Sequence, residues 1–277
     1  MTVNVAIVST DETARMALVR SLEKGPSDWV LSLHREPPTG GDVIVCSPEV
    51  ACAGALVVDP IEPGDVVARV ERLTRPRPRV VAVTSAEGGA GVTTIALHLA
   101  GALAGGGCPT AFVDLDPARA AHERLGIEAV PAPEGPRPVP VPSGFRFVAG
   151  VHPAGLHDAL PEDTAWVVLD VPLAAFSDVA RRVDAAILLI RPTPRAAQRA
   201  RAVVDAYREI AWCPVVNRLG RGGQTTAAQL DRILGGRVFE LPPCPALRDV
   251  EEEHRLLSPG WSRWSRRVRR LADALAR

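Results

Sequence analysis

Short apolar runs alternate with helix-type segments along most of the chain. Residues 80–83, 166–169 and 185–190 are uninterrupted apolar runs of the kind found in strands that are buried on both faces of a sheet. Segments with helical character, such as 95–103 and 194–210, lie between such runs. Strands that alternate with helices predict an α/β fold with a mostly parallel sheet.

The first 74 residues show the same alternation on a smaller scale. We predict strands at 3–8, 29–33, 42–48 and 55–58, and helices at 10–24 and 65–73. Arginine then alternates with proline over 75–79, which predicts an extended linker. The expected organisation is a small α/β domain at 1–74, a linker at 75–79 and a larger domain at 80–277.

A glycine-rich stretch, S-A-E-G-G-A-G-V-T-T at residues 85–94, separates the first strand of the larger domain from its first helix. Glycines allow the backbone to curl into a nest of N–H groups, and the helix adds the positive end of its dipole. An ordinary phosphate-binding loop also has a lysine immediately before its Ser or Thr, where this chain has Val92. The candidate phosphate-binding residues are Gly88, Gly89, Ala90, Gly91, Val92, Thr93 and Thr94. Lys24, the single lysine of the chain, lies far upstream.

This loop resembles the deviant P-loop of the MinD/ParA superfamily, whose pattern is K-G-G-x-G-K-[ST]. The three glycines and Thr93 match, whereas Glu87 and Val92 replace the two lysines. In the superfamily the first lysine reaches the phosphates of the partner in an ATP-bridged dimer. The resemblance therefore implies that the Glu87 carboxylate faces phosphate oxygens and that the site is degenerate.

Three polar residues at predicted strand ends extend the resemblance. Asp116, in a D-x-D-P segment, resembles the switch I residue that helps to position the attacking water and the Mg²⁺ shell; its alternative role is a helix N-cap. Asp170, in a D-x-P segment, resembles the Walker B carboxylate, so Thr93 and Asp170 would hold Mg²⁺. Asn217, in an N-R pair, resembles the asparagine that contacts adenine; without nucleotide it would be a turn former.

The last predicted helix is amphipathic. Its apolar stripe contains Trp261 and Trp264, and its other side is rich in arginine, including Arg266, Arg267 and Arg270. Two interpretations remain open. The helix packs on its own sheet, which we favour because the stripe is narrow, or it lies on an anionic membrane or a partner.

Composition restricts the kind of partner and the cellular compartment that we expect. The net charge is zero, which argues against nucleic acid as a partner. The five cysteines are scattered and no apolar run approaches 18 residues, so we expect reduced thiols and a cytoplasmic protein. Residues 129–143 contain six prolines, and we expect no regular element there.

The small first domain resembles a shortened receiver domain, with Cys46 or Ser47 at the position of the phospho-accepting aspartate. A receiver-like part followed by a MinD/ParA-like domain resembles the CpaE/TadZ family, and most closely its actinobacterial branch, which includes septum-site-determining Ssd-like proteins. The resemblance implies a positioning and scaffold protein for a Tad pilus or a type II/IV-like secretion apparatus.

Several properties of that family set further expectations. Partners would be secretion, pilus or division-apparatus proteins, with a homodimer and peripheral contact with the inner face of the membrane, at the pole or septum, as open possibilities. The cofactor would be weakly bound Mg-ATP or Mg-ADP, or none, and hydrolysis is not expected. The alternative function is a MinD-like ATPase switch, in which Arg191 or Arg218 supplies the missing charge.

Overall fold

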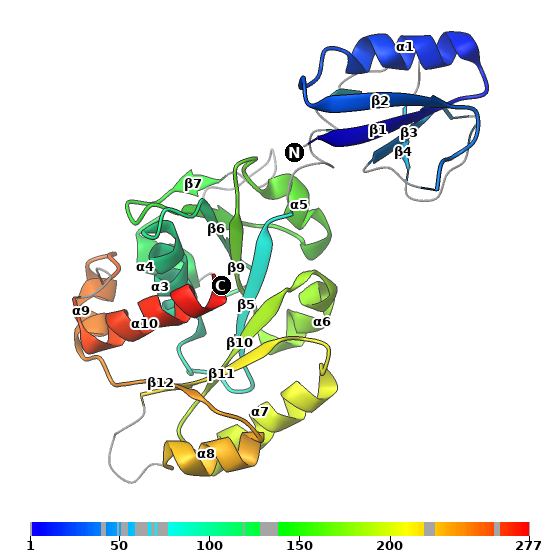
Figure 1. Cartoon of the computed structure of the whole chain (residues 1–277). Helices are drawn as coiled ribbons and strands as arrows, with labels where there is room; N and C mark the ends of the chain where they lie inside the picture. The colour runs from blue at the N-terminus through cyan, green and yellow to red at the C-terminus, as the bar shows by residue number, and fades with distance from the viewer. Residues whose placement is uncertain are drawn as a thin grey trace. The chain divides into compact units, whose positions relative to one another are not determined.

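The computed structural model describes residues 2–39, 43–48, 50, 55–58, 66–67, 70, 77–118, 120–127, 138–218, 225–257 and 261–276. The chain forms two compact units, Met1–Arg77 and Pro78–Arg277. Each unit is an α/β structure built on its own sheet (Figure 1).

The first unit has a parallel sheet in the order β2-β1-β3-β4. Its described elements are β1 (Val3–Val8), α1 (Glu12–Leu22), β2 (Trp29–His34), β3 (Val43–Cys46) and β4 (Leu56–Val57). The Asp11 side chain accepts a hydrogen bond from Thr13 N at 2.8 Å and so caps α1. Apolar side chains of α1, such as Leu18, pack on the buried side chains of β1 and β3. Most of the predicted helix at 65–73 lies outside the described residues.

The second unit has a sheet with the strand order β12-β11-β10-β5-β9-β6-β8-β7. Its strands in chain order are β5 (Arg79–Ser85), β6 (Thr110–Asp114), β7 (Val139–Pro140), β8 (Arg146–Ala149), β9 (Trp166–Asp170), β10 (Ala185–Ile190), β11 (Trp212–Asn217) and β12 (Phe239–Leu241). Every pair except β7 with β8 is parallel. The predicted α/β fold with a mostly parallel sheet is confirmed.

Helices cover both faces of this sheet because alternate strand residues point to opposite sides. Val81 and Val83 of β5 belong to the core that contains α3 (Val92–Ala104) and α10 (Arg263–Leu275). Val80 and Ala82 belong to the core under α5 (Leu156–Ala159) and α6 (Phe176–Val179). The remaining helices are α4 (Ala120–Leu125), α7 (Pro194–Ala206), α8 (Ala227–Leu234) and α9 (Ala246–Glu252), with short 3-10 turns at 153–155, 173–175 and 180–182.

Three details differ from the sequence-based expectations. Arg79, placed in the linker, is the first residue of β5. Val139 and Pro140, placed in the proline-rich loop, form the edge strand β7, where a residue without an N–H is tolerated. The sequence also predicts a helix at 249–257, whereas α9 spans Ala246–Glu252 in the structure. None of the described helices is long and apolar enough to cross a membrane.

Candidate functional site

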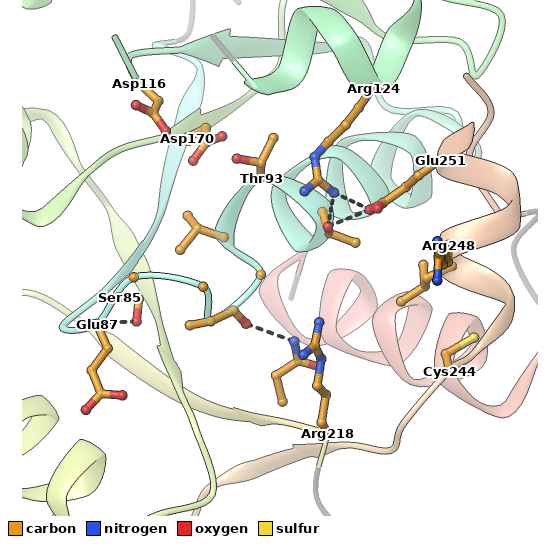
Figure 2. A pocket seen from close by; sticks show the side chains of 18 of the residues that line it. Ser85, Glu87, Thr93, Asp116, Arg124, Asp170, Arg218, Cys244, Arg248 and Glu251 are labelled. Atoms are coloured by element: carbon orange, nitrogen blue, oxygen red, sulfur yellow. Dashed lines mark hydrogen bonds and ion pairs between the residues drawn. The ribbon is translucent and has the colours of Figure 1, made fainter. Parts of the chain in front are cut away.

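The polar residues singled out in the sequence lie around one pocket of about 880 Å³ (Figure 2). Asp170 ends β9 and Asn217 ends β11, while Asp116 follows β6 and the glycine-rich loop follows β5. Because these strands are parallel, their carboxyl ends meet at the same edge of the sheet. The structure therefore brings together the candidate residues of the loop, Asp116, Asp170 and Asn217.

The glycine-rich loop is held in shape by hydrogen bonds from both sides. Ser85 Oγ donates to Leu189 O at 2.8 Å and accepts from Glu87 N at 3.1 Å. Asn217 Nδ2 donates to Ala90 O at 2.9 Å. Gly91 has a φ of +93°, and a Cβ there would lie 2.8 Å from Asn217 Nδ2. In this conformation Asn217 thus serves to fix the loop, and its contact with adenine stays a prediction.

Glu87 is held by ion pairs with two arginines of its own chain. Its carboxylate lies 3.4 Å from Arg199 Nη1 and 3.8 Å from Arg191 Nε, and Figure 2 shows the side chain directed away from Thr93. The resemblance placed this carboxylate opposite the phosphates of a partner subunit, and that expectation stays a prediction. Two neighbouring arginines offset its charge, and Arg191 is for the same reason committed outside the phosphate position.

Asp170 is the most deeply buried carboxyl group that lines the pocket, with 2% of the residue exposed. Burial, together with the nearby carboxylates of Asp114 and Asp116, raises its pKa to about 7 against the lowering effects of a hydrogen bond with Thr93 and of the Arg124 charge. Its Oδ2 has no hydrogen-bond partner within the described part of the chain. An orphaned carboxylate oxygen beside a threonine hydroxyl is a donor set that Mg²⁺ accepts.

Asp116 lies at the rim and is only half buried. Its Oδ1 accepts from Ala118 N at 2.9 Å, and its own N–H donates to Asp114 Oδ1 at 2.9 Å. It therefore closes a local turn before α4, which begins at Ala120, rather than capping that helix, while it also lines the pocket. These two roles are compatible because a carboxylate has more than one acceptor position.

Three charged residues of the pocket, Arg124, Arg248 and Glu251, escaped the sequence analysis. Arg124 of α4 contacts both Thr94 Oγ1 and Glu251 Oε1, and Thr94 Oγ1 donates to Glu251 Oε1 at 2.7 Å. Neither Arg124 nor Glu251 belongs to a recognisable motif, and 127 residues separate them. Only the contact of α4 with α9 brings them to the first turn of α3.

Arg218, the second arginine proposed to replace the lysine charge, does line the pocket. It is exposed and adopts a φ of +63°, which is uncommon for a residue with a long side chain. Arg248 also lines the pocket, but its Nε lies 3.0 Å from Glu252 Oε1 on its own helix.

The terminal helix α10 packs on α3, as the favoured interpretation predicted. Trp264 is 1% exposed, and its ring meets that of His98 edge-on at a centroid distance of 4.9 Å. Trp264 is therefore unavailable to a membrane, and the expectation that this residue contacts lipid is wrong. Trp261 is 64% exposed, Arg266 and Arg270 are also exposed, and the Arg267 guanidinium lies 5.5 Å from the centre of the Phe239 ring.

Residues 81–257 match the model of the CobQ/CobB/MinD/ParA nucleotide-binding domain. The match covers more than half of the chain, so the protein belongs to this family. No curated protein gave a significant sequence match.

Solved structures of MinD proteins are similar in fold to this chain. The Pyrococcus furiosus cell division ATPase MinD shares 18% identity at a TM-score of 0.61, covering 72% of this chain and 98% of its own. MinD from the MinC:MinD complex of Aquifex aeolicus shares 19% identity at 0.60, covering 72% and 95%. The Pyrococcus horikoshii protein, solved with Mg-ADP, shares 18% at 0.60, covering 72% and 96%. At these identities the likeness establishes the fold alone.

Proposed function

We propose that this protein is a positioning and scaffold protein of the CpaE/TadZ type, which serves a Tad pilus or a type II/IV-like secretion apparatus. Its P-loop pocket would bind Mg-ADP or Mg-ATP weakly and would not hydrolyse ATP. Support comes from the MinD/ParA-like domain, the small α/β unit that precedes it, and the altered loop.

One observation carries the proposal: the described loop has the shape of a phosphate cradle but no lysine. Val92 stands at the lysine position at the start of α3, and Glu87 is held by Arg191 and Arg199. A charge pair about 4 Å apart contributes about 4 kcal/mol at an effective dielectric constant of about 20. Loss of the lysine therefore weakens triphosphate binding and removes charge stabilisation from phosphoryl transfer.

The donors that remain fit a magnesium nucleotide in part. Backbone N–H groups of the loop and the N-terminal turn of α3 suit phosphate oxygens, and Thr93 with Asp170 suits Mg²⁺. Bound Mg²⁺ would neutralise phosphate charge. Thr93 and Asp170 would orient it, while Asn217 keeps the loop in its binding shape through the Ala90 carbonyl.

Calorimetric titration with Mg-ATP tests this account, with a turnover assay alongside. We expect weak binding and no turnover by the wild type. Val92→Lys should raise the affinity for ATP by at least tenfold. Val92→Met should not, because methionine is similar to lysine in bulk but carries no charge. Equal affinities for the two variants would show that the missing lysine is not the cause of weak binding.

A second candidate function is a septum-site-determining, MinD-like ATPase switch. The observation in its favour is that Thr93, Asp116 and Asp170 line the same pocket and that Asp170 has an unused oxygen among the described residues. In that case Arg218 is the arginine placed to supply charge, because Arg191 pairs with Glu87. Steady ATP turnover that Asp116→Ala abolishes would favour the switch over the scaffold.

We further propose a cytoplasmic protein that acts as a homodimer, with a secretion, pilus or division-apparatus partner at the inner face of the membrane. Contact with lipid would involve Trp261, Arg266 and Arg270, because the apolar stripe of α10 is buried. Co-sedimentation with anionic vesicles, compared between wild type and Trp261→Ala, tests this part. If the wild type and Trp261→Ala both stay in the supernatant, the protein does not bind the vesicles and the membrane contact is removed from the proposal.

A further inference from the structure

An internal carboxylate occupies one end of the nucleotide pocket. Glu251 of α9 accepts a hydrogen bond from Thr94 Oγ1 at 2.7 Å, and the Arg124 guanidinium contacts both groups. Figure 2 shows the Arg124 and Glu251 side chains directed toward one another near the first turn of α3, and both residues line the pocket together with Thr94. Three separate helices, α3, α4 and α9, are thus joined through one small polar cluster.

The position of this cluster indicates a role in ligand binding in addition to packing. Thr94 is the third residue of α3, where free N–H groups and the helix dipole favour negative charge. A phosphate group attracted to this turn needs the same two donors that Glu251 now uses. Glu251 is therefore placed as a competitor of an anionic ligand.

Asp170, on the other wall of the pocket, is an independent indication that the pocket receives a ligand. Its residue is 2% exposed, yet its Oδ2 has no hydrogen-bond partner among the described residues. Figure 2 shows its carboxyl group beside Thr93, one position before Thr94. A buried oxygen without a partner is costly unless a ligand satisfies it.

Arg124 is also the best-placed cation of the pocket. Arg191 is paired with Glu87, Arg248 with Glu252, and Arg218 lies exposed at the rim. The Arg124 side chain is 31% exposed and already contacts a hydroxyl of the first turn of α3. Since a guanidinium binds phosphate oxygens through two parallel hydrogen bonds, it can take over part of the work of a lysine.

We infer that Arg124 and Thr94 recognise the phosphate groups of a nucleotide and that Glu251 holds their donors until the nucleotide displaces it. The inference rests on the proposed weak nucleotide site. Displacement breaks the link of α9 to α3, while the contact of His254 Nδ1 with the Glu123 carbonyl, at 2.7 Å, still joins the chain beyond α9 to α4. Nucleotide binding is thereby reported on the surface of α9, which lies outside the loop itself.

Calorimetric titration of the full chain with Mg-ADP tests the competition. Glu251→Gln removes the competing charge and should tighten ADP binding by about tenfold. Arg124→Gln should weaken it at least tenfold, and Arg124→Lys should restore part of the loss. In the double variant Arg124→Gln/Glu251→Gln, the gain from Glu251→Gln should disappear, because no guanidinium is left to release.

A matched control comes from α9 itself. Asp249→Asn removes an exposed carboxylate of the same helix that does not line the pocket, and it should leave ADP affinity within twofold of the wild type. Hydrogen exchange of residues 246–252 gives a readout that does not depend on affinity. ADP should speed this exchange in the wild type, and Glu251→Gln should show the faster exchange without ligand.

The outcomes separate the inference from the function on which it rests. If the wild type binds ADP but Glu251→Gln binds no more tightly, or if ADP leaves exchange in α9 unchanged, the displacement is wrong and the nucleotide site stands. If neither the wild type nor Glu251→Gln binds millimolar ADP, the weak nucleotide site is wrong and the inference is overturned with it.

Discussion

The two units of this chain share a parallel-sheet architecture but differ at the carboxyl ends of their strands. Among the described residues of the first unit, those ends are closed by hydrogen bonds between neighbouring strands. Ser47 N donates to the Val8 carbonyl and Ser9 N to the carbonyl of His34, and both serines are fully buried. In the second unit the corresponding edge opens into a pocket of about 880 Å³ lined by charged side chains.

The comparison shows that the carboxyl edge of a parallel sheet can carry a functional site but does not create one by itself. In the first unit Asp11 is engaged in capping α1, and Ser9 Oγ accepts from Asp11 N, so the local polar groups satisfy one another. In the second unit the loop glycines keep backbone N–H groups accessible, and Asp170 keeps an unused oxygen. Function therefore has to be argued from the residues at the strand ends.

The largest expected effects are losses of stability that differ between the two units. Trp264→Ala empties a buried site between α10 and α3 and should lower the free energy of unfolding of the second unit by about 3–5 kcal/mol. Leu18→Ala should lower that of the first unit by about 2–5 kcal/mol. Urea titrations followed by circular dichroism measure both.

Trp261→Ala is the matched control for Trp264→Ala, because Trp261 is largely exposed and should contribute no more than about 0.5 kcal/mol. If Trp264→Ala and Leu18→Ala shift the same single transition, the two units unfold as one. The comparison between them would then apply to their chemistry alone.

The next effect concerns the glycine-rich loop that lines the pocket of the second unit. Gly91→Ala forces a side chain into a φ of +93° and brings its Cβ to 2.8 Å from Asn217 Nδ2, which disturbs the hydrogen bond to Ala90 O. Strain and a weakened buried hydrogen bond together should cost about 2–4 kcal/mol. Urea denaturation measures the loss, and calorimetry should show weaker ADP binding.

Gly88→Ala serves as the control in the same loop. A Cβ at Gly88 meets no atom within 4 Å, and its φ lies outside the left-handed region. It should change stability by no more than about 0.5 kcal/mol. Equal losses for the two variants would mean that the loop tolerates no side chain at all. That result would contradict a specific role of Asn217 in holding the loop.

Much of this second unit is predictable from the sequence, because its strands are uninterrupted apolar runs and parallel strands end at one edge. The grouping of Thr93, Asp116, Asp170 and Asn217 at one site comes from the resemblance of their segments to the MinD/ParA pattern, and the shared strand edge explains why they meet. That resemblance does not find Arg124 or Glu251, which lie on short helices without a motif and meet only through tertiary packing.

The sequence does not reveal the intrachain partners of Glu87 either. The residue occupies the position of the superfamily lysine, and its expected role toward the phosphates of a partner subunit stays a prediction. The ion pairs with Arg191 and Arg199 depend on where β10 and α7 lie relative to the loop, which no local pattern encodes. The same limit applies to α10, whose stripe fits either a core or a membrane until its neighbour α3 is known.

A smaller effect is expected from pH. Burial lowers the pKa of His98 to about 4, and it raises that of Asp170 to about 7. Between about pH 4 and 6.5 the unfolded chain binds the His98 proton and the folded protein does not, so this group makes stability rise with pH. Over the same range folded Asp170 keeps a proton that the unfolded chain releases, so it makes stability fall with pH.

The two slopes, each about 1.4 kcal/mol per pH unit, nearly cancel in the wild type. Asp170→Asn should leave a rise of stability from pH 4 to 6.5, and His98→Gln should leave a fall. Urea midpoints at several pH values measure both. Both residues lie in the second unit, so a slope that follows the transition of the first unit would contradict this assignment.

The smallest expected effect is the absence of phosphorylation in the first unit. Cys46 and Ser47, at the acceptor position of the receiver-like strand, are fully buried, and Asp11 is engaged at the N-cap of α1. We expect that incubation with acetyl phosphate and Mg²⁺ yields no modified peptide from residues 43–48 by mass spectrometry. A receiver domain with an intact acceptor aspartate, treated in parallel, shows that the donor is active. A phosphorylated peptide from this segment would place a regulated group in the first unit, and the contrast between a closed and an open strand edge would no longer separate the two units by function.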